Sequence, residues 1–163
     1  MRLHLQPILL AVLFLVLPVM ASAQSQDEIT EAQLTAYVNT VDSATRRGNV
    51  NGVVATMAKD VKIKTTLVLP STNEEKVLSL TRDQYATLTR NAMRRRLAYN
   101  LVRKNTRFKI YEGGKTATVT SDIYETLTLK QGTVRGVSSE VAIVNLRDGR
   151  LLVTSIEARL RIY

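Results

Sequence analysis

Apolar residues recur every three or four positions along the first half of the chain, a spacing that predicts helices. Ser25 and Glu28 fit a capping box for a first helix, and Gly48 is a natural end for it. Asn49 can cap a short second helix, and Thr81 a third. The apolar positions of the first two helices are Leu34, Tyr37, Val38, Val41 and Ala44, then Val50, Val53, Val54, Met57 and Ala58.

Between the second and third helices, and again where the third ends near Tyr99, the pattern changes to the alternation of strands. Residues 61–69 alternate β-branched residues with lysines up to Pro70, and 75–80 can return as an antiparallel partner. Turns at 112–114, 131–132 and 148–149 then join long strands into an antiparallel meander. The apolar positions of the meander are Phe108 and Ile110, then Ala117, Val119, Ile123, Leu127 and Leu129, then Val137, Val141 and Ile143, then Leu152, Ile156, Leu160 and Ile162.

Residues 1–23 have the parts of a secretory signal peptide. Arg2 supplies the positive start, residues 8–20 are apolar, and Ala21-Ser22-Ala23 matches a cleavage site. The apolar run is shorter than the roughly 20 residues that a membrane-spanning helix needs. We therefore expect cleavage after Ala23, no transmembrane segment in the mature protein, and a periplasmic or secreted location.

The chain of 163 residues contains 23 Lys+Arg against 14 Asp+Glu, a formal net charge of +9. The stretch from 90 to 109 has no acidic residue and contains Arg90, Arg94, Arg95, Arg96, Arg103, Lys104, Arg107 and Lys109. Such a run predicts either a solvated face that keeps the protein soluble or a contact with an anionic component of the cell envelope. Aromatic residues for base stacking are sparse in it, which argues against nucleic acid as the partner.

One junction, together with the order of the elements, resembles the nuclear transport factor 2-like superfamily. The junction reads Gly48-Asn-Val-Asn-Gly-Val-Val-Ala-Thr-Met-Ala-Lys-Asp60-Val61. The superfamily includes polyketide-cyclase-like, ketosteroid-isomerase-like and scytalone-dehydratase-like proteins. The resemblance implies an α+β fold, a cone-shaped roll in which three helices from the N-terminal half pack on a curved, mostly antiparallel sheet. It also implies a single domain over residues 24–163 and a homodimer across the sheet.

Most of the catalytic residues that the resemblance implies are missing from this chain. Its isomerases place an acidic base near the start of the first strand, where this chain has Val61-Lys-Ile-Lys-Thr-Thr. Its dehydratases rely on histidine, and the one histidine here is His4, inside the predicted signal peptide. Cysteine is absent, which excludes thiolate nucleophiles and cysteine metal sites. We expect no catalytic residue, no cofactor and no metal ion, although buried Asp, Glu, Lys or Tyr can still move protons.

Periodicity brings several polar side chains to the faces that are expected to line the cone. On the third helix, Arg96 falls near the middle of the apolar arc. On the strand 117–129, Ser121 and Glu125 share the register of the apolar residues. We predict that Arg96 and Glu125 pair and recognise the polar end of a ligand, with Tyr37 and Tyr85 as an aromatic wall. The alternative is that Arg96 reaches solvent at the helix end and a bulge turns Glu125 outward.

Three functions stay open. The first is a non-catalytic module that binds a small apolar ligand or a partner in the cone. The second is an isomerase- or cyclase-like enzyme that acts on a hydrophobic carbonyl compound with a buried carboxylate as base. The third is an envelope-associated protein held by the basic residues Arg90, Arg94, Arg95, Arg103, Lys104, Arg107 and Lys109. An ionisable acid in an open cavity favours the enzyme, and a filled cavity excludes both ligand functions.

Overall fold

The computed structural model describes residues 27–69 and 72–163. The predicted signal peptide of residues 1–23 and its cleavage site lie outside the described residues. So do Ser25 of the predicted capping box, Pro70 at the predicted end of the first strand, and Ser71 of the turn after it.

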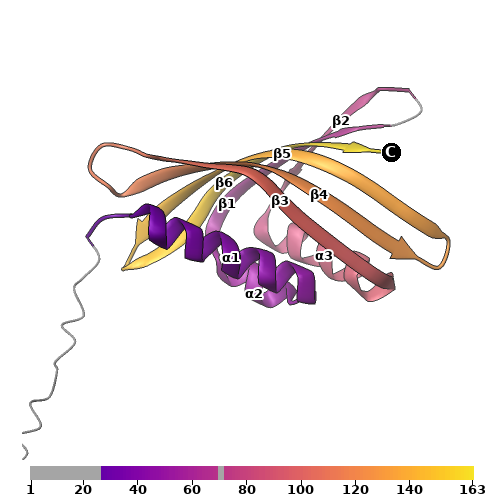
Figure 1. The fold of residues 1–163 in the computed structure, drawn as a ribbon, viewed down its shortest axis with the longest axis horizontal. Helices are drawn as coiled ribbons and strands as arrows, with labels where there is room; N and C mark the ends of the chain where they lie inside the picture. Colours follow the sequence, from indigo (N-terminus) through magenta and orange to yellow (C-terminus); the bar gives the residue numbers. More distant parts are fainter. Residues whose placement is uncertain (1–26, 70–71) are drawn as a thin grey trace, which may run out of the picture.

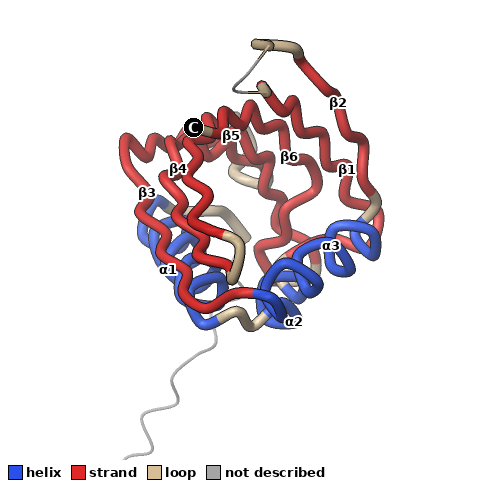
Figure 2. The backbone as a smooth tube through the Cα atoms, turned by 90° about the vertical axis from the view of Figure 1, so that its right-hand side faces the viewer, coloured by secondary structure: helices blue, strands red, loops and turns tan. Residues whose placement is uncertain are grey.

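Three helices lie on one side of a single six-stranded sheet (Figure 1). The elements are α1 (Glu31–Arg47), α2 (Val50–Ala55), β1 (Met57–Val68), β2 (Glu75–Leu80), α3 (Arg82–Arg95), β3 (Arg96–Ile110), β4 (Thr116–Leu129), β5 (Gly132–Arg147) and β6 (Arg150–Ile162). The strand order is β2-β1-β6-β5-β4-β3, and every neighbouring pair is antiparallel except β1 with β6. The sheet bends around the interior and the helices close its open side (Figure 2). The predicted α+β roll is confirmed.

The first helix begins later than the sequence pattern predicts. Its N-cap is Thr30 and not Ser25: the Thr30 hydroxyl accepts from the Gln33 amide at 3.3 Å, and the Gln33 side chain accepts from the Thr30 amide at 2.6 Å. Ahead of this cap, Ile29 is buried and its amide donates to the Gly114 carbonyl at 2.7 Å. This hydrogen bond to the turn between β3 and β4 keeps Ile29 out of the helix, because its amide is already bonded elsewhere.

The other two predicted N-caps are present. The Asn49 side chain accepts from the Gly52 amide at 2.9 Å at the start of α2. Thr81 caps α3 and forms a capping box with Gln84. Each cap satisfies amide groups that have no partner inside the helix, which is why the helices start at these residues.

Two helices end earlier than predicted, because sheet pairing takes over. Met57 and Ala58, where the apolar spacing continues α2, are the first residues of β1 and are buried. The third helix stops before Arg96, which is extended (φ −72°, ψ 142°) and opens β3 directly. Leu97 is therefore 65% exposed and does not lie on a buried helical arc, and Tyr99 belongs to the strand.

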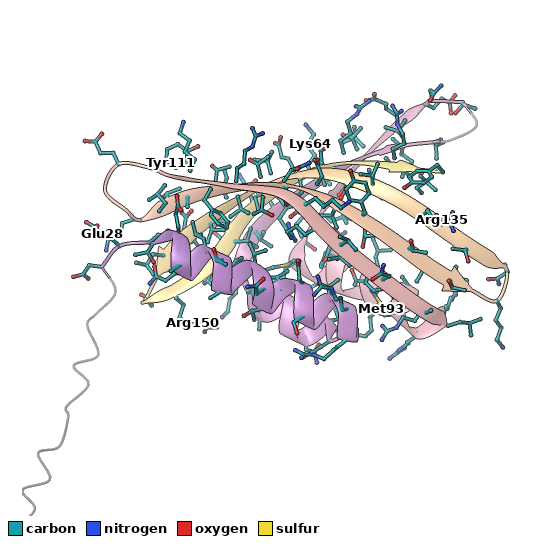
Figure 3. All side chains as sticks on the ribbon, viewed as in Figure 1. Glu28, Lys64, Met93, Tyr111, Arg135 and Arg150 are labelled. Atoms are coloured by element: carbon teal, nitrogen blue, oxygen red, sulfur yellow. The ribbon has the colours of Figure 1, made fainter. Side chains whose placement is uncertain are left out.

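Strand alternation gives the sheet a concave face toward the helices and a convex face away from them. Lys64 of β1 lies on the convex side and Met93 of α3 on the helical side (Figure 3). The concave positions of β4 are the predicted ones, and their cross-strand partners identify those of β5. The facing pairs are Ala117 with Val144, Val119 with Ala142, Ser121 with Glu140, Ile123 with Ser138, and Glu125 with Gly136. Val141 and Ile143, which mark β5 in the sequence, thus face outward and are exposed.

The hydrophobic core lies where α1 and α2 pack on the sheet. Leu34 of α1 and Val144 of β5 are fully buried, beside Val53, Ala117 and Val153. No helix within residues 27–69 and 72–163 has the length and apolar character to cross a membrane.

Candidate functional site

A cavity of about 490 Å³ lies between the helices and the concave face of the sheet. Every helix and every strand contributes to its lining, from Tyr37 on α1 to Ile162 on β6. Sites for small molecules typically have volumes of about 300–1,000 Å³. The cone is therefore not filled by its own side chains.

The lining changes from apolar and closed to exposed along the strands. At the closed end the floor consists of Val119, Ala142 and Val144, all buried. At the other end Leu88 of α3 and Val134 of β5 line the same cavity and are 53% and 39% exposed. The mouth of the cavity is thus between α3 and the end of the sheet where β4 turns into β5. The charged side chains of the lining lie between floor and mouth.

Arg103 of β3 is the centre of a buried ionic cluster. Its Nε donates to Asp42 Oδ1 at 3.0 Å, and its Nη1 donates to Ser121 Oγ and lies 3.3 Å from Glu140 Oε1. The side chains of Arg103 and Asp42 are 9% and 7% exposed. Arg46 lies 3.8 Å from the other Asp42 oxygen. Buried charges persist only as a compensated set, so removing one member leaves its partners uncompensated.

Glu140 is the carboxylate of this cluster that lines the cavity. Burial raises the pKa of Glu140 above its usual range, and the nearby Arg103 guanidinium opposes that rise. A carboxyl group with a raised pKa in a mostly apolar cavity can take up or release a proton closer to neutral pH.

Glu125 lines the cavity nearer the mouth, and Tyr99 donates its phenol hydroxyl to it. Burial and the Glu125 carboxylate hold the pKa of Tyr99 above its ordinary value. Burial, with the charges of Glu140 and Glu125, raises the pKa of Tyr85 to about 12. Both phenols therefore keep their protons at neutral pH. We call Glu125, Glu140, Tyr85 and Tyr99 the acidic wall of the cavity.

The two carboxylates of the acidic wall are spaced along the strands. Glu125 faces Gly136, and Glu140 faces Ser121, four residues further along each strand. At about 3.4 Å per residue this is about 14 Å between backbone positions. The backbone positions of the two carboxylates are therefore well separated along the sheet, although the charge of Glu125 still acts on Glu140.

Of the predicted pocket residues, Tyr37, Tyr85 and Glu125 line the cavity. Ser121 is on the concave face but is 2% exposed and does not line the cavity. Its hydroxyl accepts a hydrogen bond from Arg103, so Ser121 belongs to the ionic cluster.

The predicted pair between Arg96 and Glu125 does not form. Arg96 Nη2 donates instead to the Arg47 carbonyl at 3.0 Å, at the end of α1. Its guanidinium covers Gly48, where an added Cβ would lie 1.9 Å from Arg96 Nη1. The prediction is wrong because Arg96 belongs to a strand and not to the helical arc, and Tyr99 occupies the place beside Glu125.

The predicted basic patch is divided among three places. Arg90 on α3 is half-buried, with Nη2 at 3.3 Å from Asn51 Oδ1. Arg103 is interior, and its expected exposure is wrong because strand alternation turns it to the concave face. The members that are exposed are Arg94 and Arg95 on α3, and Lys104, Arg107 and Lys109 on β3.

Asp42, Glu140 and the hydrogen bond from Tyr99 to Glu125 escaped the sequence analysis. A signal for Asp42 is present, because it follows Leu34 and Val38 at intervals of four and so shares their buried face of α1. A carboxylate at such a position requires a cation. Glu140 is harder to find, since the apolar residues of its strand occupy both registers.

The cavity offers an apolar floor, phenol donors and carboxylate acceptors. It can enclose an apolar body, form hydrogen bonds with a polar group, and exchange a proton at Glu140. No group of three or more metal-ligating side chains occurs among the residues that the structure describes.

No protein-family model and no curated protein sequence matches the chain, whereas many solved structures do. A candidate calcium/calmodulin-dependent protein kinase II association domain from Xanthomonas campestris is 20% identical, over 80% of this chain and 88% of its own, with a TM-score of 0.60. A candidate scytalone dehydratase from Novosphingobium aromaticivorans is 12% identical, over 79% of this chain and 84% of its own, with a TM-score of 0.65. A nuclear transport factor 2-like protein from Cytophaga hutchinsonii is 14% identical, over 80% of this chain and 98% of its own, with a TM-score of 0.58. The chain has a nuclear transport factor 2-like fold, as the junction at residues 48–61 predicts.

Proposed function

We propose that this protein binds a small, mostly apolar molecule in the cavity, with a polar group of that molecule at the acidic wall. The observation that carries the proposal is the open cavity of about 490 Å³, whose floor is apolar and whose charged groups are confined to one stretch of the lining. Such a distribution favours a ligand with an apolar body and few polar atoms.

A neutral apolar dye such as Nile red tests the proposal. We expect a saturable rise in its fluorescence with the wild-type protein. Ala142→Phe should abolish the rise, because Ala142 forms part of the floor. The matched control is Val141→Phe, since the neighbouring side chain lies on the convex face and is 42% exposed. Equal dye binding by the two folded variants would place the dye outside the cavity and contradict the proposal.

Proton transfer on a hydrophobic carbonyl compound is the second candidate, favoured by the raised pKa of Glu140 inside the cavity. Exchange of the acidic hydrogens of 2-tetralone in D₂O, followed by NMR, tests it. Glu140→Gln should abolish catalysed exchange while Nile red still binds. Absence of exchange in the wild type, with dye binding intact, would leave binding without proton transfer as the function.

Contact with an anionic envelope surface is a third candidate, supported by the convex face. Basic side chains project there from four strands: Lys62, Lys64, Lys104, Arg107, Lys109, Arg135, Arg159 and Arg161. Vesicles with phosphatidylglycerol should retain the protein and neutral vesicles should not, and about 0.5 M salt should release it. Retention that survives this salt would contradict an electrostatic contact.

Secretion and self-association remain predictions. Mass spectrometry of the exported protein should find Gln24 as its first residue, and an intact Met1 in a membrane pellet would contradict export by cleavage. For the homodimer across the sheet, sedimentation at low and high salt is informative. The like charges of the convex face oppose such pairing, so a dimer through that face should strengthen as salt is added.

A further inference from the structure

We propose that the polar group recognised in the cavity is a cationic amine, so that the ligand is an apolar amine and not an apolar acid. This inference rests on the proposed binding function. It follows from the charges that line the cavity and from which of them already have partners.

Arg103, the cation of the lining, is already compensated. It lies 3.0 Å from Asp42 and 3.3 Å from Glu140, and two of its three nitrogens donate to protein oxygens. An anionic ligand that approaches it meets Glu140 at the same place. Like charges at such a distance repel, so the cluster disfavours a carboxylate or phosphate.

Glu125 has the opposite status. Within the described residues no ion pair includes it, and its hydrogen-bond partner is the neutral phenol of Tyr99, which donates to Oε1. A carboxylate has about four acceptor sites on its two oxygens, so Glu125 can accept further hydrogen bonds. Arg103 already pairs with Asp42 and Glu140, so Glu125 is a carboxylate of the lining with which a cationic ligand can still pair.

An ammonium group fits this position. It has three donors and keeps its charge at neutral pH, since alkylamines resemble lysine, whose pKa is ~10.4. Its contact with Glu125 is a charge-assisted hydrogen bond, the stronger class. Tyr85 and Tyr99 line the same cavity, so their aromatic rings border the volume that the ligand would occupy.

Three ligands with one apolar body and different polar ends test the inference: 1-naphthalenemethylamine, 1-naphthalenemethanol and 1-naphthoate. We measure their dissociation constants by calorimetry at pH 7 with the wild type and two carboxylate variants. Glu125→Gln removes the charge of the acidic wall near the mouth. Glu157→Gln is the matched control, because Glu157 is exposed and faces Val141 on the convex side.

We expect the amine to bind about tenfold more tightly than the alcohol, and naphthoate to bind most weakly. Glu125→Gln should bring the amine to the affinity of the alcohol and leave the alcohol within about twofold of its wild-type value. That retained alcohol binding also shows that the variant is folded. Glu157→Gln should change none of the three.

Two outcomes overturn the inference. One is naphthoate binding as tightly as the amine, and the other is an amine no tighter than the alcohol in the wild type. In both, the naphthalene body still binds and the proposed function stands. Failure of all three ligands to bind, together with failure of Nile red, would overturn the proposed function itself.

Discussion

The charged residues on the two faces of the sheet differ in their burial and in their partners. On the concave face, Glu140 and Arg103 are enclosed and held by named partners, and the acidic wall faces a cavity. On the convex face, basic side chains project into solvent, and the Lys104 ammonium there lies 5.1 Å from the centroid of the Tyr124 ring. Arg103 and Lys104 are neighbours in sequence. Because side chains alternate along a strand, a shift of one residue decides whether a cation points into the interior, where it compensates buried carboxylates, or into solvent.

The largest effect should come from the pair of neighbours themselves. Arg103→Met leaves Asp42 and Glu140 without their cation inside the protein, and we expect it to lower the free energy of unfolding by about 3–5 kcal/mol. Lys104→Met should change it by less than about 0.5 kcal/mol. Urea denaturation of both variants measures the difference. Similar values for the two would mean that the faces do not differ in this way.

A smaller effect is expected from two tyrosines on opposite faces. Tyr99→Phe removes the hydroxyl that donates to Glu125, and a hydrogen bond to a charged group contributes about 1.5 kcal/mol. Tyr124→Phe keeps the ring beneath Lys104 and should leave stability unchanged within about 0.5 kcal/mol. The same denaturation experiment applies. A larger loss of unfolding free energy in the Tyr124 variant than in the Tyr99 variant would contradict a stabilising hydrogen bond from Tyr99 to Glu125.

The smallest effect is measured with pH, since Glu140 on the concave face and Asp122 on the convex face have pKa values shifted in opposite directions. Glu140 has a raised pKa through burial, so the native state holds its proton more tightly than the unfolded chain does. The contribution of Glu140 to the free energy of unfolding is full below the ordinary glutamate pKa. It is lost as the pH rises through the pKa of Glu140 in the native state. The stability of Glu140→Gln relative to the wild type should therefore increase from pH 4 to pH 8.

Asp122 on the convex face supplies the control with the opposite sign. Hydrogen bonds from Asn105 and Ser139 lower its pKa, so its contribution is present above the ordinary aspartate pKa and is lost as the pH falls. Relative to the wild type, Asp122→Asn should become less stable from pH 3 to pH 6. Parallel slopes for the two variants would contradict the pKa directions.

The sequence predicts which side chains of a strand point inward only where apolar residues occupy a single set of alternate positions. In β4 the apolar residues occupy one register, so the inward placement of Ser121 and Glu125 follows from alternation alone. In β5 both registers carry apolar residues, and the pairing of Ser121 with Glu140 selects the inward one. That choice depends on a neighbouring strand and is absent from local pattern.

Helix ends show the same limit. Ser25 with Glu28 and Thr30 with Gln33 both fit the capping pattern, and the bond from Ile29 to Gly114 favours the second. At the other boundary, an apolar residue at 97 fits a helix as well as a strand. The strand wins because the segment from Arg96 onward pairs with β4. Local spacing predicts that an element exists, and distant contacts decide where it stops.

The position of α3 between two strands has a mechanical consequence. β2 and β3 are the two edges of the sheet, and α3 joins them with the single residue Thr81 on one side and none on the other. With 14 residues at about 1.5 Å each, the helix is a strut of about 21 Å. Its length therefore sets how far apart the edges stand, and hence how strongly the sheet curls. Adding one turn to α3 should widen the cone, and removing one should close it, without altering any residue of the lining on the strands.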